Sequence, residues 1–138
     1  DRLREAGGEY GAKTGRPRRV GPLDLVATRY GVQVQGATAL ALTKLDVLSY
    51  LEKIPVCTHY DIGGKLTNAF PFPAALGSAK PVVEMLDGWG CDISGVREWK
   101  DLPEAARQYV DFVEEQLACP IRYVSVGAER DACLLHQR

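Results

Sequence analysis

The feature that most constrains this chain is a short apolar run that stops abruptly at polar residues. The run, Ala39 to Leu42, is uncharged, and Thr43, Lys44 and Asp46 come directly after it. Its length and the preceding Gly36 favour a buried strand of a parallel sheet over residues 38–43. Ligands of open α/β sheets bind just beyond the carboxyl ends of such strands. We therefore expect Lys44 and Asp46 to lie at a ligand-binding edge.

The side chains of Lys44 and Asp46 have the chemistry needed to recognise guanine. A carboxylate accepts two parallel N–H bonds, and guanine offers such a pair at N1 and its exocyclic amine. A lysine stem can lie along a purine face while its ammonium stays in water. Spacing alone favours the alternative, a solvated Lys and Asp at a strand end, so both interpretations stand.

Periodicity and turn residues predict an α/β fold in which a mainly parallel sheet has flanking helices. Helices are expected over residues 1–8, 24–35, 47–51 and 101–117, the last capped by Asp101. Further strands are expected over 54–60, 65–68, 82–86, 121–126 and 132–135, with a small hairpin at Gly63-Gly64. The segment 68–81, with three prolines, is expected to be an irregular excursion. A length of 138 residues fits one domain.

The strand that follows the last long helix also ends in small or polar residues, Ser125, Val126 and Gly127. If it runs parallel to the strand at 38–43, both carboxyl ends share one edge of the sheet. Backbone groups of Ser125 to Gly127 would then complete a base pocket begun by Asp46. Gly127 lacks a Cβ, which permits close approach to a flat ligand.

A cationic loop lies near the amino end, and it reads as neither helix nor strand. Its sequence, G-A-K-T-G-R-P-R-R at 11–19, contains the cations Lys13, Arg16, Arg18 and Arg19, the hydroxyl of Thr14, and two glycines. The glycines free the backbone to direct successive N–H groups at an anion, and arginine forks suit carboxylates and phosphates. A solvated cationic turn explains the composition equally well.

Composition argues against several functional classes. Seventeen basic and eighteen acidic residues give a net charge of −1, which does not favour nucleic-acid or membrane-surface binding. No apolar run approaches the roughly 18 residues of a membrane span, and the charged amino end lacks the apolar core of a signal peptide. We expect a cytoplasmic protein.

Cysteine and histidine positions do not predict a metal site or a catalytic centre. The cysteines, at 57, 91, 119 and 133, form no C-x-x-C pair, and reduced, mostly buried thiols are favoured over two disulfides. His59 and His136 are expected to be structural, and no serine has an evident base partner. Walker and G-x-G-x-x-G motifs are absent. We expect neither catalytic residues nor metal ligands in this chain.

Together these motifs resemble the adenylosuccinate synthetase family. The resemblance rests on G-A-K-T-G-R-P-R-R at 11–19, L-T-K-L-D-V-L at 42–48 and S-V-G at 125–127, with support from G-V-R at 95–97 and L-P-E-A-A-R-Q-Y at 102–109. It implies that residues 1–138 are the carboxyl-terminal portion of a longer, P-loop-NTPase-like enzyme. The phosphate loop, the catalytic aspartate and histidine and most of the IMP site would then lie upstream.

The resemblance also implies an activity. Family members use GTP and Mg²⁺ to join IMP and L-aspartate on the purine route to AMP, releasing GDP and phosphate. The γ-phosphoryl group moves to the 6-oxygen of IMP, and the aspartate amine then displaces it. The complete enzyme is expected to be a homodimer and this chain to be inactive alone. The alternatives are a non-catalytic guanine-nucleotide-binding module and a purely structural α/β domain.

Roles for individual residues follow by matching positions to the family motifs. The loop that closes on L-aspartate would be Ala12, Lys13, Thr14, Gly15, Arg16, Pro17 and Arg18, with Arg16 also at the IMP ribose and Arg18 also at GTP. Guanine would be held by Lys44, Leu45 and Asp46 and by Ser125, Val126 and Gly127. Several positions depart from the usual family pattern: Lys13 replaces a threonine, Pro22 an aromatic residue and Ala128-Glu129 a Pro-Asp pair, and the ending His136-Gln137-Arg138 is atypical.

Overall fold

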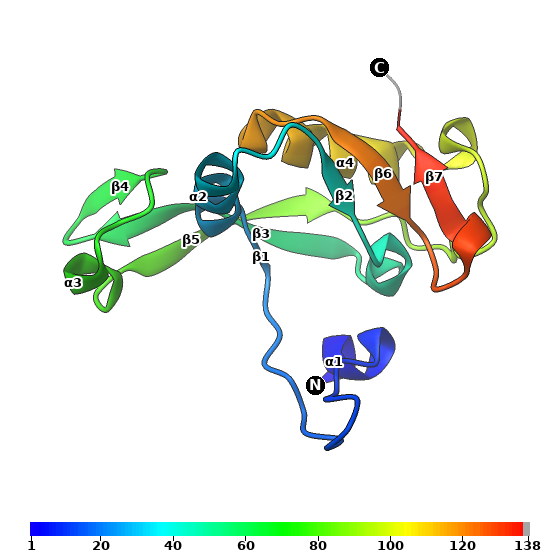
Figure 1. The fold of residues 1–138 in the computed structure, drawn as a ribbon, viewed down its shortest axis with the longest axis horizontal. Coiled ribbons are helices and arrows are strands. Elements are labelled where there is room, and N and C mark those ends of the chain that lie inside the picture. The colour runs from blue at the N-terminus through cyan, green and yellow to red at the C-terminus, as the bar shows by residue number, and fades with distance from the viewer. Residues whose placement is uncertain (137–138) are drawn as a thin grey trace.

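The computed structural model describes residues 1–136, which form two β-sheets with helices packed against them (Figure 1). One sheet contains β1 (Leu23–Asp24), β3 (Lys53–Ile62), β4 (Lys65–Thr67) and β5 (Lys80–Asp87). The other contains β2 (Leu40–Leu42), β6 (Ile121–Ser125) and β7 (Cys133–Leu135). The helices are α1 (Arg2–Gly7), α2 (Leu25–Gln35), α3 (Pro73–Leu76) and α4 (Glu104–Leu117), with 3₁₀ turns η1 (Leu45–Leu48), η2 (Trp99–Asp101) and η3 (Arg130–Ala132).

The α/β class is confirmed, but the expectation of a mainly parallel sheet is corrected. Within residues 1–136, β1–β3 and β2–β6 are parallel, whereas β3–β4, β3–β5 and β6–β7 are antiparallel. The predicted hairpin joins β3 to β4 through Gly63 and Gly64, which both have positive φ. Short connections of this kind join antiparallel neighbours, so the chain returns beside β3 instead of crossing over. The excursion at 68–81 contains α3 and leads back into β5.

Strands β2 and β6 pair in parallel, which meets the condition for a shared ligand-binding edge. Leu40 lies opposite Ile121 and Leu42 opposite Val124, so the carboxyl ends of both strands meet at one edge. Ile121 and Val124 are both buried although they are three residues apart, and the pairing with β2 shifts register between them, so side chains do not alternate regularly along β6. The pairing brings together the two segments that the sequence singles out.

Helix α4 buries an apolar face and begins later than the sequence predicts. Its predicted apolar stripe is buried in the main core: Ala106, Tyr109, Val110, Val113 and Leu117. The helix begins later than expected, however, because its N-cap is Pro103 and not Asp101. A residue before proline is forced into extended backbone, and Leu102 has φ −65° and ψ 143°. Asp101 is therefore separated from α4 and cannot cap it.

Helix α2 is fixed at both ends as its sequence suggests. Asp24 accepts a hydrogen bond from the Ala27 N–H at 3.0 Å, and its carboxylate also accepts one from the Tyr60 hydroxyl. Gly36 ends the helix in the left-handed region with φ 62°. The predicted turn after β2 begins at Leu45, two residues earlier than expected.

The remaining sequence expectations concern cysteines, histidines and aromatic anchors. All four cysteines are free, but only Cys57 and Cys119 are buried. His136 is buried, and its Nδ1 lies 2.9 Å from the Ile121 carbonyl, consistent with a structural role. Trp89 belongs to the buried core and Trp99 packs against it. None of the helices within residues 1–136 has the length and apolar character needed to cross a bilayer.

Candidate functional site

The two turns that follow β2 and β6 are in direct contact. The Lys44 N–H donates a hydrogen bond to the Ser125 hydroxyl at 3.0 Å. Lys44 has φ 62°, a left-handed conformation that is uncommon for a residue other than glycine. This conformation turns the chain sharply from β2 into η1, where Leu45 is buried in the core and Asp46 follows. The structure thus joins the T-K-L-D and S-V-G segments into one corner at the carboxyl edge of the sheet.

Asp46 carries an unusual feature within this corner. Its Oδ1 atom is buried and has no hydrogen-bond partner among the described residues. Buried acceptors are nearly always paired, and leaving one unpaired costs about 1–3 kcal/mol. Asp46 lies in η1, which contacts β6 beside Ser125. Oδ1 is therefore an acceptor without a donor within residues 1–136, and because the chain itself covers it, a ligand reaches it only if the covering groups move.

The Lys44 side chain is placed differently from the sequence expectation. Its ammonium is not surrounded by water alone: Nζ donates to the Gly7 carbonyl at 2.6 Å and pairs with the Glu9 carboxylate. The lysine stem is therefore stretched from the corner toward the end of α1. Leu45 contributes to the corner through its backbone, because its side chain belongs to the core.

The three residues of the S-V-G segment have different environments. Ser125 accepts from Lys44, whereas Val126 is fully buried and its N–H donates to the Ala132 carbonyl at 2.9 Å. A Cβ on Gly127 would lie 3.2 Å from the Cβ of Ala132. Close packing against η3 is thus a reason for glycine at this position that the sequence did not reveal.

The cationic loop is closed on itself. Tyr10 and Pro17 form an isolated antiparallel bridge, and between them Gly11 N–H donates to Arg16 O and Gly15 N–H to Gly11 O, each at 2.8 Å. The amides of Gly11 and Gly15 are therefore used within the loop and are not available to an anion. Gly15 has φ 63°, so its glycine-specific conformation is used to make this tight turn.

The loop's side chains, in contrast, are available. Residues 12–19, which include Ala12, Lys13, Thr14 and Pro17, are all exposed, and Figure 1 shows the loop at the far end of an extended segment below β1. The guanidinium of Arg16 has no hydrogen bond or ion pair within residues 1–136. The Arg18 guanidinium lies 3.3 Å from the Glu9 carboxylate.

Sequence reasoning missed Glu9, which links the loop to the corner. One carboxylate oxygen pairs with Lys44 Nζ and the other with Arg18 Nη1. The hydrogen bond from Lys44 has the largest effect and lowers the pKa of Glu9 below its ordinary value. Burial opposes it, and the charges of Lys44 and Arg18 and the hydrogen bond from Arg18 add to the lowering. The only signal in the sequence was a single acid next to a cationic loop.

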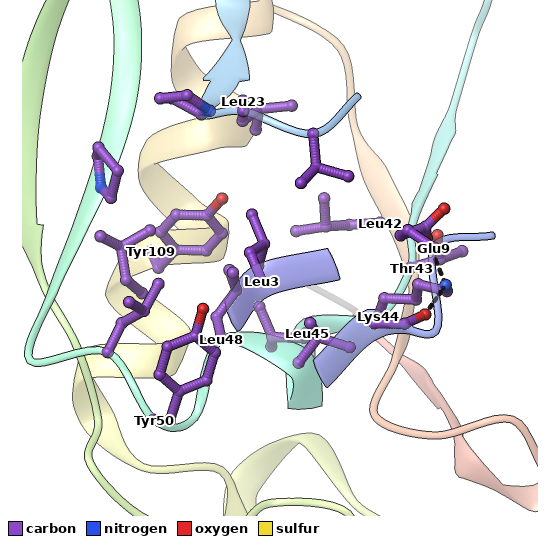
Figure 2. A pocket seen from close by; sticks show the side chains of 18 residues that line it. Leu3, Glu9, Leu23, Leu42, Thr43, Lys44, Leu45, Leu48, Tyr50 and Tyr109 are labelled. Atoms are coloured by element: carbon purple, nitrogen blue, oxygen red, sulfur yellow. Dashed lines mark hydrogen bonds and ion pairs between the residues drawn. The ribbon is translucent and has the colours of Figure 1, made fainter. Parts of the chain in front are cut away.

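An apolar cavity of about 470 Å³ lies beside the corner, between α1, the segment 20–23, η1 and the start of β3. Figure 2 shows Glu9, Thr43 and Lys44 together at one end and the rings of Tyr50 and Tyr109 at the other. Pro22 also lines the cavity, but Asp46 does not. Lys44 and Leu45 line the cavity, but the carboxylate proposed to pair with guanine does not, so the cavity is not the candidate base site. Residues 1–136 contain no group of three or more His, Cys, Asp or Glu side chains placed to hold a metal ion.

The fold and the corner define the chain as an α/β protein in which two motif-bearing turns meet at the carboxyl edge of a parallel strand pair. Comparison with known proteins identifies the family. A protein-family model described as adenylosuccinate synthetase matches residues 1–134. The chain therefore belongs to the adenylosuccinate synthetase family.

Individual relatives agree with this result. The chain is 50% identical over 136 residues to an adenylosuccinate synthetase of Pelobacter propionicus, covering 98% of this chain and 32% of the relative. It is 49% identical over 131 residues to one of Fusobacterium nucleatum, covering 94% and 31%. The solved structure of fully ligated adenylosuccinate synthetase from Plasmodium falciparum superposes with a TM-score of 0.92 at 37% identity, covering 99% of this chain and 33% of that one. The chain thus spans about a third of the length of these relatives.

Proposed function

We propose that this chain supplies the guanine-binding corner and the aspartate-binding loop of an adenylosuccinate synthetase. The complete enzyme would join IMP and L-aspartate to form adenylosuccinate, with release of GDP and phosphate, in the synthesis of AMP. The observation that carries the proposal is the buried, unpaired Oδ1 of Asp46, held in a K-L-D turn against Ser125. Membership of the family supports the reaction.

The corner would recognise the hydrogen-bonding edge of guanine. Its N1–H and exocyclic amine supply the donors that the Asp46 carboxylate lacks. Adenine has an acceptor at N1 and no amine at position 2, so it would leave the carboxylate unpaired. The Lys44 stem would lie along one face of the base, and Leu45, Ser125, Val126 and Gly127 would line the rest of the pocket through backbone and hydroxyl groups.

The loop would bind L-aspartate through side chains. Because the Gly11 and Gly15 amides are used within the loop, the exposed guanidinium of Arg16 is the best-placed group for a carboxylate and for the IMP ribose. Arg18 would contact L-aspartate and GTP. Ala12, Lys13, Thr14, Gly15 and Pro17 would form the rest of the closing loop.

The chemical step would depend on groups outside this chain. We assign no catalytic residue here, and phosphoryl transfer requires positioning and neutralisation of charge that the upstream part would supply. A Mg²⁺ ion accompanying GTP would also be held there, since residues 1–136 offer no cluster of ligands for it. Four free cysteines fit a cytoplasmic enzyme, and the family resemblance supports a homodimer and a P-loop-NTPase-like whole.

A chimera tests the proposal. The 138 residues replace the matching third of the Pelobacter propionicus relative, and ligation of IMP and L-aspartate is measured with GTP and with ATP. We expect GTP-dependent formation of adenylosuccinate by the chimera and none by the 138-residue chain alone. A folded chimera that binds GDP without ligation would instead favour a nucleotide-binding module, and equal use of ATP and GTP would refute the guanine corner.

A further inference from the structure

We propose that Glu9 is a positioning residue that couples the cationic loop 11–19 to the guanine corner, by sharing its carboxylate between Arg18 and Lys44. This inference rests on the proposed function of those two segments. It assigns a role to a residue that is in neither motif.

The contacts of Glu9 hold its carboxylate at one place. Its N–H donates to the Arg4 carbonyl at 2.9 Å, at the end of α1, and its own carbonyl accepts from the Arg18 N–H at 3.0 Å. The main chain of Glu9 is thus fixed to the helix on one side and to the base of the loop on the other. The Arg18 carbonyl in turn accepts from Arg4 Nε at 2.7 Å. A side chain supported in this way can position the groups it touches.

The two cations that share the carboxylate are not held equally. Lys44 Nζ is bound closely to Glu9 and also to the Gly7 carbonyl, whereas Arg18 Nη1 lies at 3.3 Å and its side chain is 60% exposed. Only 23% of the Glu9 side chain is exposed. Arg18 is therefore the partner that an incoming carboxylate or phosphate can recruit, and Lys44 is the one that stays.

Competition at Arg18 links the two segments. When a ligand acid draws Arg18 away, the whole negative charge of Glu9 acts on Lys44 and holds its stem in place beside the corner. Conversely, a base packed on the Lys44 stem holds the Glu9 carboxylate toward Lys44, which weakens its contact with Arg18 and frees that guanidinium for the ligand acid. Such coupling is reciprocal, so each ligand changes the affinity for the other by the same factor.

Substitution of Glu9 by glutamine should have effects of opposite sign on the two substrates. In the active chimera, Glu9→Gln removes the competitor for Arg18 and loosens Lys44, so KM for L-aspartate falls and KM for GTP rises, each by about two- to fivefold. Mere structural damage would worsen both. Glu115→Gln, at an exposed position of α4 that belongs to neither segment, is the matched control and should change neither, while Glu9→Asp, which keeps the charge, should restore part of the effect. Shifts in the same direction, or no shift, overturn the inference.

A second readout does not depend on activity. Amide hydrogen exchange of the 138-residue chain is measured with and without GDP. We expect GDP to slow exchange at residues 43–46 and to change exchange across the loop 11–19, and Glu9→Gln to abolish only the change in the loop. An effect at 43–46 without any in the loop overturns the role of Glu9 alone. No effect at either segment contradicts the proposed guanine corner as well.

Discussion

Replacing Asp46 by asparagine changes the hydrogen-bonding character of the corner with little change in its shape. The carboxylate Oδ1 is buried and unpaired, so it is the group that gains most from a ligand donor. Asparagine keeps one oxygen acceptor but places an amide donor opposite one N–H of guanine. The substitution therefore removes one of the two charge-assisted bonds and weakens the other.

The expected size of the effect follows from the bond that is lost. A hydrogen bond to a charged group contributes about 1.5–3 kcal/mol, which corresponds to roughly 10- to 150-fold in affinity. GDP should bind to the Asp46→Asn chain more weakly by this factor. XDP should bind more tightly, because the new amide donates to the 2-oxo group of xanthine.

Calorimetric titration of the 138-residue chain with GDP, XDP and ADP measures this directly. The unsubstituted chain should prefer GDP to ADP, and Asp46→Asn should shift the preference toward XDP. Asp101→Asn is the matched control, because Asp101 is exposed in η2 and does not cap α4. An unchanged order of affinities after Asp46→Asn would refute the reasoning.

Three further predictions concern stability. Asp46→Ala should leave the free energy of unfolding unchanged or raise it by up to about 1–3 kcal/mol, since it removes an unpaired buried acceptor. The same substitution should abolish the rise in Tm that GDP causes. A large loss of stability would contradict this prediction. The lowered pKa of Glu9 means that its pairing with Lys44 stabilises the chain above the ordinary pKa of 4.5, and this stabilisation is lost as pH falls through the lowered pKa. In urea unfolding, Glu9→Gln should therefore have a lower free energy of unfolding than the unsubstituted chain at neutral pH, and the difference should disappear in acid. Gly127→Ala should destabilise by about 1 kcal/mol through crowding of the Ala132 Cβ, and adding Ala132→Gly should restore the loss; failure of the rescue would show that this contact is not the cause.

Local sequence signals predicted much of the fold around the corner. The 3.6-residue stripe of α4 and the apolar runs of β2 and β6 are properties of the segments themselves, so their positions follow from the sequence. The parallel pairing of β2 with β6 was only a condition of the sequence argument, and the structure supplies it. The division into two sheets does not follow from the sequence either, because β5 could pair with any strand of suitable pattern, and packing selects β3. Asp101 fits a capping pattern, but the effect of Pro103 on Leu102 overrides it.

The same distinction applies to the candidate site. Asp46 and Ser125 could be singled out because each follows a recognisable strand, and the Lys44–Ser125 contact joins the two ends as expected. The contact of the Lys44 ammonium with the Gly7 carbonyl depends on where α1 packs in the fold. A charged helix of six residues has no apolar periodicity from which its packing position could be predicted. Glu9 was missed for the same reason. The closure of the loop through Gly11 and Gly15 follows from backbone geometry that composition does not encode.

The crystal structure of the chain with bound GDP tests guanine recognition most directly. We predict that N1 and the exocyclic amine of the base lie within hydrogen-bonding distance of the Asp46 carboxylate, so that Oδ1 acquires its missing donor, with the base beside Ser125. A base bound in the apolar cavity between Tyr50 and Tyr109, or anywhere else with Oδ1 still unpaired, would contradict the assignment.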